Sequence, residues 1–301
     1  MSGLVIVAGS AHAALAEQLA GAIGAPQLQV ERERFPDGEL SVRLLDSARG
    51  FDAVIVQPTG PQVDENIIEL LALADACRRA GVESVIAVVP YFGYARGDRR
   101  GGTRRPIMAS LIARLMQAAG IGHVVTVDLH APQIEGFFEV PLDDLAAYPL
   151  LLGELRDRLP HDVAVVSPDL GRLELATKIA DELGTSAAVV QKRRASGRES
   201  RALQVVGDVA DRCCLVVDDM ITTGGTIRGA TRALVEAGAR PDIRVAATHG
   251  LFMPGAAEAL SHPSITEMCV TDTLPQPRDG SPKRIVVPIA PLLAEAIEKL
   301  G

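Results

Sequence analysis

The sequence predicts an α/β fold with two similar domains, each a mainly parallel β-sheet flanked by helices. Two observations indicate this fold. Short apolar runs of strand length alternate with amphipathic helical stretches along the whole chain. The alternation also repeats, because residues 52–91 and 212–250 both read as strand, loop, helix and strand with nearly the same spacing.

The length and composition fit two such domains. The chain has 301 residues, which suits two domains of about 150. Of its residues 48% are hydrophobic, and tryptophan is absent, a profile typical of Val- and Ile-rich strands under Ala- and Leu-rich helices. We place the N-terminal domain at residues 1–146 and the C-terminal domain at residues 147–301. We expect the last helix to pack back on the N-terminal domain.

The expected strands are short runs rich in Val, Ile and Ala, each bounded by small or polar residues. In chain order they are Leu4–Ala8, Ala53–Gln57, Ser84–Val89, His123–Val127, Val163–Ser167, Ala187–Gln191, Cys213–Val217 and Ile243–His249. The expected helices are stretches in which apolar residues recur every three or four positions. They are Ala11–Ile23, Glu65–Ala80, Pro106–Ala119, Leu173–Leu183 and Thr226–Ala237.

Charge and apolar patterning exclude several classes of protein. The net charge of −8 argues against nucleic acid as a partner. No apolar run approaches the roughly 18 residues that span a membrane. The first apolar stretch lacks a preceding basic segment, so we interpret it as a strand and not as a signal peptide. The adjacent Cys213 and Cys214 lie in an apolar run without metal-ligand spacing, which indicates reduced core residues. We therefore expect a soluble, cytoplasmic protein.

The sharpest local motif joins an apolar strand to a helix through two carboxylates and a turn rich in hydroxyl groups and glycine. The glycines let backbone N–H groups turn inward, and the helix N-terminus adds its positive dipole end, so the turn suits a phosphate monoester. The two acids suit sugar hydroxyls or a metal-bound ligand. The alternative, an acidic turn with an ordinary N-cap, leaves this convergence at one strand end unexplained. The motif comprises Asp218, Asp219, Thr222, Thr223, Gly224, Gly225 and Thr226.

Three further segments carry side chains suited to chemistry, and each also has an ordinary structural interpretation. Lys192 and Arg194 precede a small polar stretch, where cations on a closing loop could reach a transferring phosphate group; the alternative is a solvated basic run. His130, at a strand end, is either a ligand or a hydrogen-bonded structural residue. The turn at residues 35–39 offers an aromatic ring and two carboxylates for a nucleobase, or is a plain turn.

These segments together resemble a known family. Residues 216–226 resemble the phosphoribosyl-binding motif of type I phosphoribosyltransferases. Several other segments, in the family's order, resemble ribose-phosphate diphosphokinases, which are also called phosphoribosyl diphosphate synthases. They are residues 35–39, 89–96, 126–131, 133–138, 166–169, 192–194 and 248–250.

The resemblance implies two type I phosphoribosyltransferase-like domains, with the ATP site in the first and the ribose 5-phosphate site in the second. It implies transfer of the β,γ-diphosphoryl group of Mg-ATP to O1 of ribose 5-phosphate, for nucleotide biosynthesis. It also implies a homo-oligomer, from dimer to hexamer, whose active sites are completed by neighbouring subunits.

The implied residue roles follow the matching motifs. The family's catalytic cations correspond to Lys192 and Arg194, and its Mg²⁺ site to His130 and Asp169. The implied ATP-binding residues are Phe35, Asp37, Glu39, Arg96, Asp98 and Arg99. The implied ribose 5-phosphate-binding residues are Asp218, Asp219, Thr222, Thr223, Gly224, Gly225 and Thr226.

Two departures from the family pattern leave alternatives open. Gly97 stands where the family has a glutamine, and Arg172 stands where the family has a second glycine. The arginine that the family carries shortly afterwards is absent, and Arg172 could supply a displaced cation. The alternatives are a non-catalytic regulatory paralogue and a diphosphokinase for another sugar phosphate.

Overall fold

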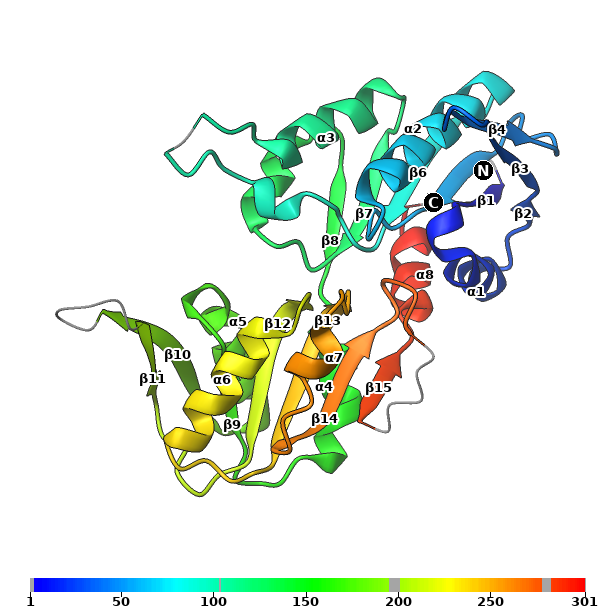
Figure 1. The fold of residues 1–301 in the computed structure, drawn as a ribbon. Helices are drawn as coiled ribbons and strands as arrows, with labels where there is room; N and C mark the ends of the chain where they lie inside the picture. The colour runs from blue at the N-terminus through cyan, green and yellow to red at the C-terminus, as the bar shows by residue number, and fades with distance from the viewer. Residues whose placement is uncertain (1–2, 103, 195–200, 278–282, 301) are drawn as a thin grey trace. The chain divides into compact units, whose positions relative to one another are not determined.

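The computed structural model describes residues 3–102, 104–194, 201–277 and 283–300, with the side chains of residues 192–194, 201 and 202 outside the description. The chain divides into two compact units (Figure 1). Unit 1 comprises residues 1–146, 273–275 and 288–301, and unit 2 comprises residues 147–272 and 276–287. Each unit is built on a sheet of mostly parallel strands, so the predicted α/β fold class is confirmed.

Unit 1 contains a six-stranded parallel sheet in the order β2-β1-β5-β6-β7-β8 and a separate hairpin, β3-β4. The strands are β1 (Leu4–Ala8), β2 (Gln27–Leu28), β3 (Val30–Arg34), β4 (Leu40–Leu44), β5 (Asp52–Val56), β6 (Ser84–Val89), β7 (His123–Val127) and β8 (Leu142–Leu145). The helices are α1 (Ala13–Ile23), α2 (Val63–Ala80), α3 (Met108–Ala118) and α8 (Ala290–Glu298).

Helices cover both faces of the unit 1 sheet. Because side chains alternate along a strand, Val5 and Val7 of β1 point into one core and Ile6 into the other. The first core receives the buried apolar stripes of α2 and α3, including Leu70, Leu73 and Met116. On the other side α1 contacts α8, the last helix of the chain, which belongs to unit 1.

The carboxyl ends of β1 and β5 meet at the point where the chain order of the unit 1 sheet reverses, and buried polar groups fill this point. The Glu69 carboxylate of α2 accepts hydrogen bonds from Ser10 N at 2.9 Å, Arg32 Nε at 2.5 Å and Gln57 Nε2 at 3.2 Å. Ser10 Oγ also donates to it. A Cβ atom on Gly9 would lie 1.9 Å from Gln57 Oε1, so only glycine fits there. Side chains of unit 1 itself therefore occupy its switch point.

Replacing Glu69 with alanine is expected to lower the free energy of unfolding by about 3–5 kcal/mol. The carboxylate is 5% exposed, and its loss removes the acceptor of four donors, including the Arg32 guanidinium. Denaturant unfolding followed by circular dichroism measures the change. Glu31→Ala is the matched control: its ion pair with Arg43 is exposed, so about 1 kcal/mol or less is expected. Equal losses in both variants would contradict the assigned role of Glu69.

Unit 2 contains a seven-stranded sheet in the order β11-β10-β9-β12-β13-β14-β15, parallel except for the β10–β11 pair. The strands are β9 (Ala164–Ser167), β10 (Ser186–Arg194), β11 (Arg201–Val206), β12 (Cys214–Ile221), β13 (Ile243–Gly250), β14 (Ile265–Thr271) and β15 (Arg284–Val287). The helices are α4 (Tyr148–Leu155), α5 (Leu173–Leu183), α6 (Gly225–Glu236) and α7 (Ala256–Ala259).

The unit 2 sheet is also buried on both faces. Val216 and its neighbours in register pack under α6 and α7, whereas Leu215 and Val217 pack under α4 and α5. The four cysteines are buried and free, and burial raises the pKa of Cys213 to about 12. The prediction of reduced core cysteines is therefore confirmed. Within the described ranges, no helix combines the length and the apolar content needed to cross a membrane.

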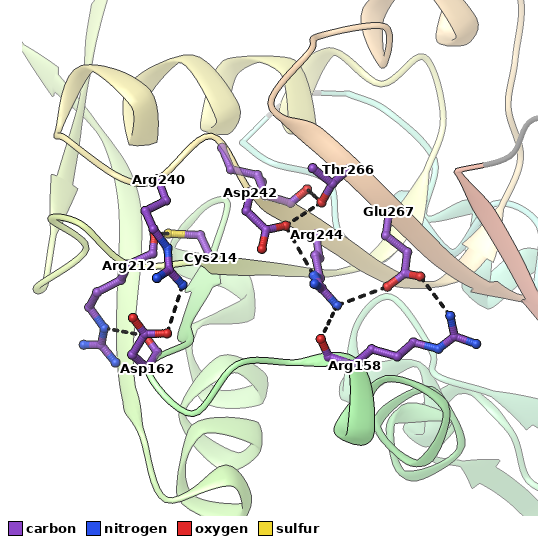
Figure 2. A network of polar contacts seen from close by, with 10 residues as sticks. Arg158, Asp162, Arg212, Cys214, Arg240, Asp242, Arg244, Thr266 and Glu267 are labelled. Atoms are coloured by element: carbon purple, nitrogen blue, oxygen red, sulfur yellow. Dashed lines mark hydrogen bonds and ion pairs between the residues drawn. The ribbon is translucent and has the colours of Figure 1, made fainter.

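A network of polar contacts, which includes two separate groups of ion pairs, lines the amino ends of the unit 2 strands (Figure 2). Asp162 accepts from Arg240 at 2.9 Å, and Arg244 lies 3.4 Å from both Asp242 and Glu267. Further hydrogen bonds to backbone carbonyls come from Arg212 and Arg244. The network ties strand starts together at the edge opposite to the carboxyl ends, where parallel sheets bind ligands.

Several elements differ from the sequence-based expectation. The run expected to end at Val217 continues as β12 to Ile221, and the run expected to end at Gln191 continues as β10 to Arg194. Hydrogen bonding to β13 and to β11 extends these strands into polar sequence, where apolar content no longer marks them. The hairpin β3-β4 and the edge strands β2 and β8 lack a strong apolar pattern and were not predicted, and β11 (Arg201–Val206), β14 (Ile265–Thr271) and β15 (Arg284–Val287) were not predicted either.

Candidate active site

The carboxyl ends of β9 and β12 are neighbours at the centre of the unit 2 sheet. From β9 the chain crosses through α5 to β10 on one side, whereas from β12 it crosses through α6 to β13 on the other. The order of the strands therefore reverses between β9 and β12, which is the usual position of a ligand crevice in an open α/β sheet. Asp169 follows β9 and the acid pair Asp218-Asp219 lies in β12, so the predicted motifs meet at this switch point.

The acid pair lies within β12 and not after it, which corrects the prediction that the strand ends before the two acids. Asp219 is 5% exposed, and its backbone N–H donates to Asp218 Oδ1 at 2.9 Å. Hydrogen bonding to β13 fixes the backbone here, because Asp218 pairs with Ala247 and Met220 with His249. The two carboxylates are therefore held by a central strand and not by a loop.

A guanidinium lies against both carboxylates. Arg172 ends the 3-10 helix η5 (Leu170–Arg172); its Nη2 contacts Asp219 Oδ2, and its Nε lies 3.9 Å from Asp218 Oδ1. The Arg172 side chain is 17% exposed, so this ion pair is largely shielded from water. From the sequence, Arg172 could replace the positive charge of the arginine that the family carries nearby. In the structure the partners of this charge are Asp218 and Asp219.

Asp218 is an unusual carboxyl group. Burial, followed by repulsion from Asp219, raises its pKa from the ordinary value of 3.8 to about 8, although the Arg172 charge opposes this rise. A carboxyl group with a strongly perturbed pKa beside a charged partner is typical of a functional site.

Replacing Asp218 with asparagine is expected to raise the melting temperature by an amount that grows with pH. Because the folded-state pKa of Asp218 lies above its unfolded value, the folded chain keeps a proton between pH 4 and 8 that the unfolded chain has lost. This group therefore lowers stability progressively as pH rises through that window, and the loss levels off above pH 8. Asparagine removes the penalty and retains an oxygen acceptor for Asp219 N.

Thermal unfolding of both chains between pH 5 and 9 measures this difference. Asp162→Asn is the matched control, since Asp162 is an exposed acid of the same unit, paired with Arg240. A melting temperature of Asp218→Asn below that of the wild type at pH 8 would contradict the account.

The turn after β12 provides backbone donors for an anion. Gly224 precedes α6 with a φ of 72° and makes no side-chain cap, so the first N–H groups of the helix face outward from its end. Met253 N donates to Thr222 O at 3.0 Å and anchors the turn. Thr222 is half-buried, and Thr223 and Thr226 are exposed. The predicted phosphate turn therefore has the backbone form that phosphate binding requires.

The predicted catalytic cations lie on a hairpin. Lys192 pairs with Leu203, and Arg194 with Arg201, in the antiparallel β10-β11 ladder. The polar stretch expected to close over the site, residues 195–200, lies outside the described residues, as do the Lys192 and Arg194 side chains.

Two of the segments predicted to bind ATP are anchored to the start of α2 in unit 1. Arg34, which precedes the turn at residues 35–39, pairs with Glu65 at 2.8 Å. The Tyr94 hydroxyl, in the loop after β6, donates to Asp64 at 2.5 Å. The aromatic and acidic turn and the arginine-containing loop are therefore neighbours along one helix end. The sequence did not single out Asp64 and Glu65, because acids in a first helical turn are common.

The side chains of these two segments differ in exposure. Phe35 is 40% exposed, and Asp37 caps its own turn by accepting from Glu39 N at 3.1 Å. In the other loop Arg96 is exposed, whereas Asp98 is buried and accepts a hydrogen bond from Gln133 Nε2. Arg99 is 82% exposed, with its Nε 3.9 Å from Asp98. The exposed ring and cations are available to a ligand, whereas Asp98 joins the loops after β6 and β7.

His130 and Asp169 belong to different units. His130 is half-buried after β7 in unit 1. Asp169 is exposed after β9, and its Oδ1 accepts from Gly171 N at 2.8 Å. The described part of the chain contains no group of three His, Cys, Asp or Glu side chains arranged to hold a metal ion. Each residue alone offers a donor of a type that Mg²⁺ accepts, and Mg²⁺ commonly takes few protein ligands and completes its shell with phosphate oxygens and water.

Similarity to known proteins extends over nearly the whole chain. Residues 4–120 match the N-terminal domain of ribose phosphate pyrophosphokinase, and residues 173–301 match the phosphoribosyl synthetase-associated domain. The chain is 40% identical to a ribose-phosphate pyrophosphokinase of Thermotoga maritima, over 98% of this chain and 94% of that protein. It is 42% identical to that of Rhodopirellula baltica, over 100% and 96%. The crystal structure of phosphoribosylpyrophosphate synthetase from Mycobacterium smegmatis matches with a TM-score of 0.93 at 39% identity, over 99% of both chains.

Proposed function

The chain belongs to the ribose-phosphate pyrophosphokinase family and is an enzyme of that kind, and we propose that it makes phosphoribosyl diphosphate from ribose 5-phosphate and Mg-ATP. The observation that carries the proposal furthest is the junction of the buried acid pair, the phosphate turn and a strand-order reversal in unit 2. Acids that accept sugar hydroxyls beside a turn that binds a phosphate monoester suit a phosphorylated sugar.

The proposed reaction is a displacement at phosphorus. The O1 hydroxyl of ribose 5-phosphate attacks the β-phosphorus of ATP, so a bond from O1 to the β-phosphorus forms. The bond between the β-phosphorus and the oxygen that bridges it to the α-phosphorus breaks, and AMP leaves with that oxygen. The hydroxyl proton passes to solvent. Catalysis of such a step depends on positioning and on fixed positive charge more than on covalent chemistry.

The proposed roles follow the geometry of each unit. In unit 2, Asp218 and Asp219 accept the ribose hydroxyls, and the turn from Thr222 to Thr226 binds the 5-phosphate. On the β10-β11 hairpin, Lys192 and Arg194 supply positive charge to the transferring diphosphoryl group.

In unit 1, the exposed ring of Phe35 stacks on adenine, and Asp37 and Glu39 accept from its amino group. Arg96 and Arg99 contact the phosphates, and Asp98 holds their loop. His130 and Asp169 would hold Mg²⁺, which when bound to the ATP phosphates supplies charge neutralisation to the transferred group.

We further propose a cytoplasmic homo-oligomer whose subunits share active sites, as the family resemblance implies. Size-exclusion chromatography with light scattering measures the oligomeric state, and a monomer that retained full activity would contradict the shared sites.

A panel of acceptors tests the substrate assignment. Ribose 5-phosphate is expected to support AMP formation from Mg-ATP, whereas ribose, which lacks the phosphate, is expected to lose most of this activity because the turn after β12 is left empty. If the enzyme preferred a different sugar phosphate, the assignment of ribose 5-phosphate as the acceptor would be wrong, whereas the assignment of diphosphoryl transfer would stand.

A further inference from the structure

The Arg172 guanidinium is buried against the two carboxylates proposed to hold the sugar. The Arg172, Asp218 and Asp219 side chains are 17%, 13% and 6% exposed, respectively. Charges that are this far removed from water interact strongly, and a cation there has a large effect on the acids that it contacts.

The local structure fixes the position of this cation. β9 is hydrogen-bonded to β12, with Val166 opposite Val216. At the end of β9, Ser167 Oγ donates to Asp169 O at 2.5 Å, and in the segment that follows Gly171 N donates to Asp169 Oδ1 at 2.8 Å. Arg172 follows at once and begins the junction with α5. Its guanidinium is therefore anchored by a short segment tied to the same strand pair that carries the acids.

The charges of the cluster leave it suited to the neutral, hydroxyl-bearing ring of a sugar phosphate. Burial, followed by repulsion between the two acids, raises the pKa of Asp218, and the guanidinium between them offsets part of this repulsion. A guanidinium has donors only, and its planar shape fixes the carboxylates that it bonds. Carboxyl oxygens accept hydrogen bonds from sugar hydroxyls, and the proton that Asp218 keeps at neutral pH can be donated to one.

We propose that Arg172 is a positioning residue of the sugar subsite, which fixes the position of Asp219 and orients both acids toward the hydroxyls of ribose 5-phosphate. This inference rests on the proposed function, because it assigns the acid pair to the sugar. Arg172 acts through the acids and does not touch the reacting atoms.

Arg172→Gln tests the inference, with binding of ribose 5-phosphate measured by titration calorimetry and turnover measured by AMP formation. The Kd and KM for ribose 5-phosphate are expected to rise about 10–100-fold. Without the guanidinium the two acids are no longer held in place, so their hydrogen bonds to the sugar hydroxyls are weakened or lost. The KM for ATP and the kcat at saturating ribose 5-phosphate are expected to change less than about threefold, because the transferred group is not contacted. Arg172→Lys keeps the charge and is expected to recover part of the affinity.

Arg240→Gln is the matched control, because Arg240 also pairs with an aspartate of unit 2 but lies at the amino ends of the strands (Figure 2). It is expected to leave the Kd for ribose 5-phosphate unchanged. A double-mutant cycle with Asp219→Asn then tests the route of the effect. Positioning through the acid pair predicts that Arg172→Gln has little further effect on Kd once Asp219 is neutral.

Three results would overturn the assignment: an unchanged Kd in Arg172→Gln, fully additive effects in the cycle, or a loss of kcat without a change in Kd. Should Arg172→Gln fail to fold, the same cycle with Arg172→Lys decides, because an effect of lysine that is independent of Asp219 contradicts the inference. A wild-type chain that bound no ribose 5-phosphate would instead overturn the proposed function. If the wild type and Arg172→Gln bound ribose 5-phosphate equally tightly, the role of Arg172 would be overturned and the proposed function would stand.

Discussion

Replacing Gly224 with valine is expected to abolish the binding of ribose 5-phosphate and to destabilise unit 2. Gly224 has a φ of 72°, and a Cβ atom there would lie 2.9 Å from Leu260 Cγ and 3.1 Å from Ala259 Cβ. Valine therefore adds backbone strain of about 1–3 kcal/mol and an overpacking cost of about 1–3 kcal/mol. The turn relieves both by moving its backbone donors away from the phosphate. A displacement of this kind costs about 100-fold in turnover, and loss of the whole subsite costs more.

Gly184→Val separates the two causes. Gly184 ends α5 in the same unit with a φ of 66°, but a Cβ atom on it would meet no other atom within 4 Å, so valine there adds strain without a clash. This control is expected to lose some stability and to retain the Kd for ribose 5-phosphate. Calorimetric titration and thermal unfolding of both variants measure the difference. Retained ribose 5-phosphate binding in Gly224→Val would contradict the role of the turn.

Replacing Lys192 with alanine is expected to lower kcat by about 100–1000-fold, because a fixed cation that stabilises developing charge is removed. The KM values for ATP and ribose 5-phosphate are expected to change little, since the charge is needed chiefly in the transition state. Leu203 pairs with Lys192 in the register of the β10-β11 ladder, so Leu203→Ala perturbs the same hairpin without removing the cation. A similar loss of kcat in both variants would assign the effect to the hairpin and contradict a catalytic role for Lys192.

The sequence predicts most central strands because their apolar runs are long enough to be buried on both faces, although β14, which lies inside the unit 2 sheet, was missed. Leu4–Ala8, Ser84–Val89 and His123–Val127 have the expected bounds. Some edges were missed for a physical reason: a short edge strand such as β2 or β8 is defined by its hydrogen-bonding partner and not by its own side chains. The same reason explains why β12 continues through its two acids.

The candidate site follows the same division. Motifs within one loop, such as the turn at Thr222–Thr226, can be recognised in the sequence because a single backbone segment forms them. Contacts between distant segments cannot, and the Arg172–Asp219 ion pair and the Glu69 network are of this kind. The local sequence hints at the Glu69 network only through a charged residue, Glu69, that stands among the apolar buried positions of α2.

Release of AMP by the purified chain, given Mg-ATP with and without ribose 5-phosphate, tests the central claim most directly. The account predicts AMP formation that depends on ribose 5-phosphate, accompanied by an equal amount of phosphoribosyl diphosphate, and nearly absent in Lys192→Ala. Folded protein that binds ATP but forms no AMP above background with ribose 5-phosphate would contradict it.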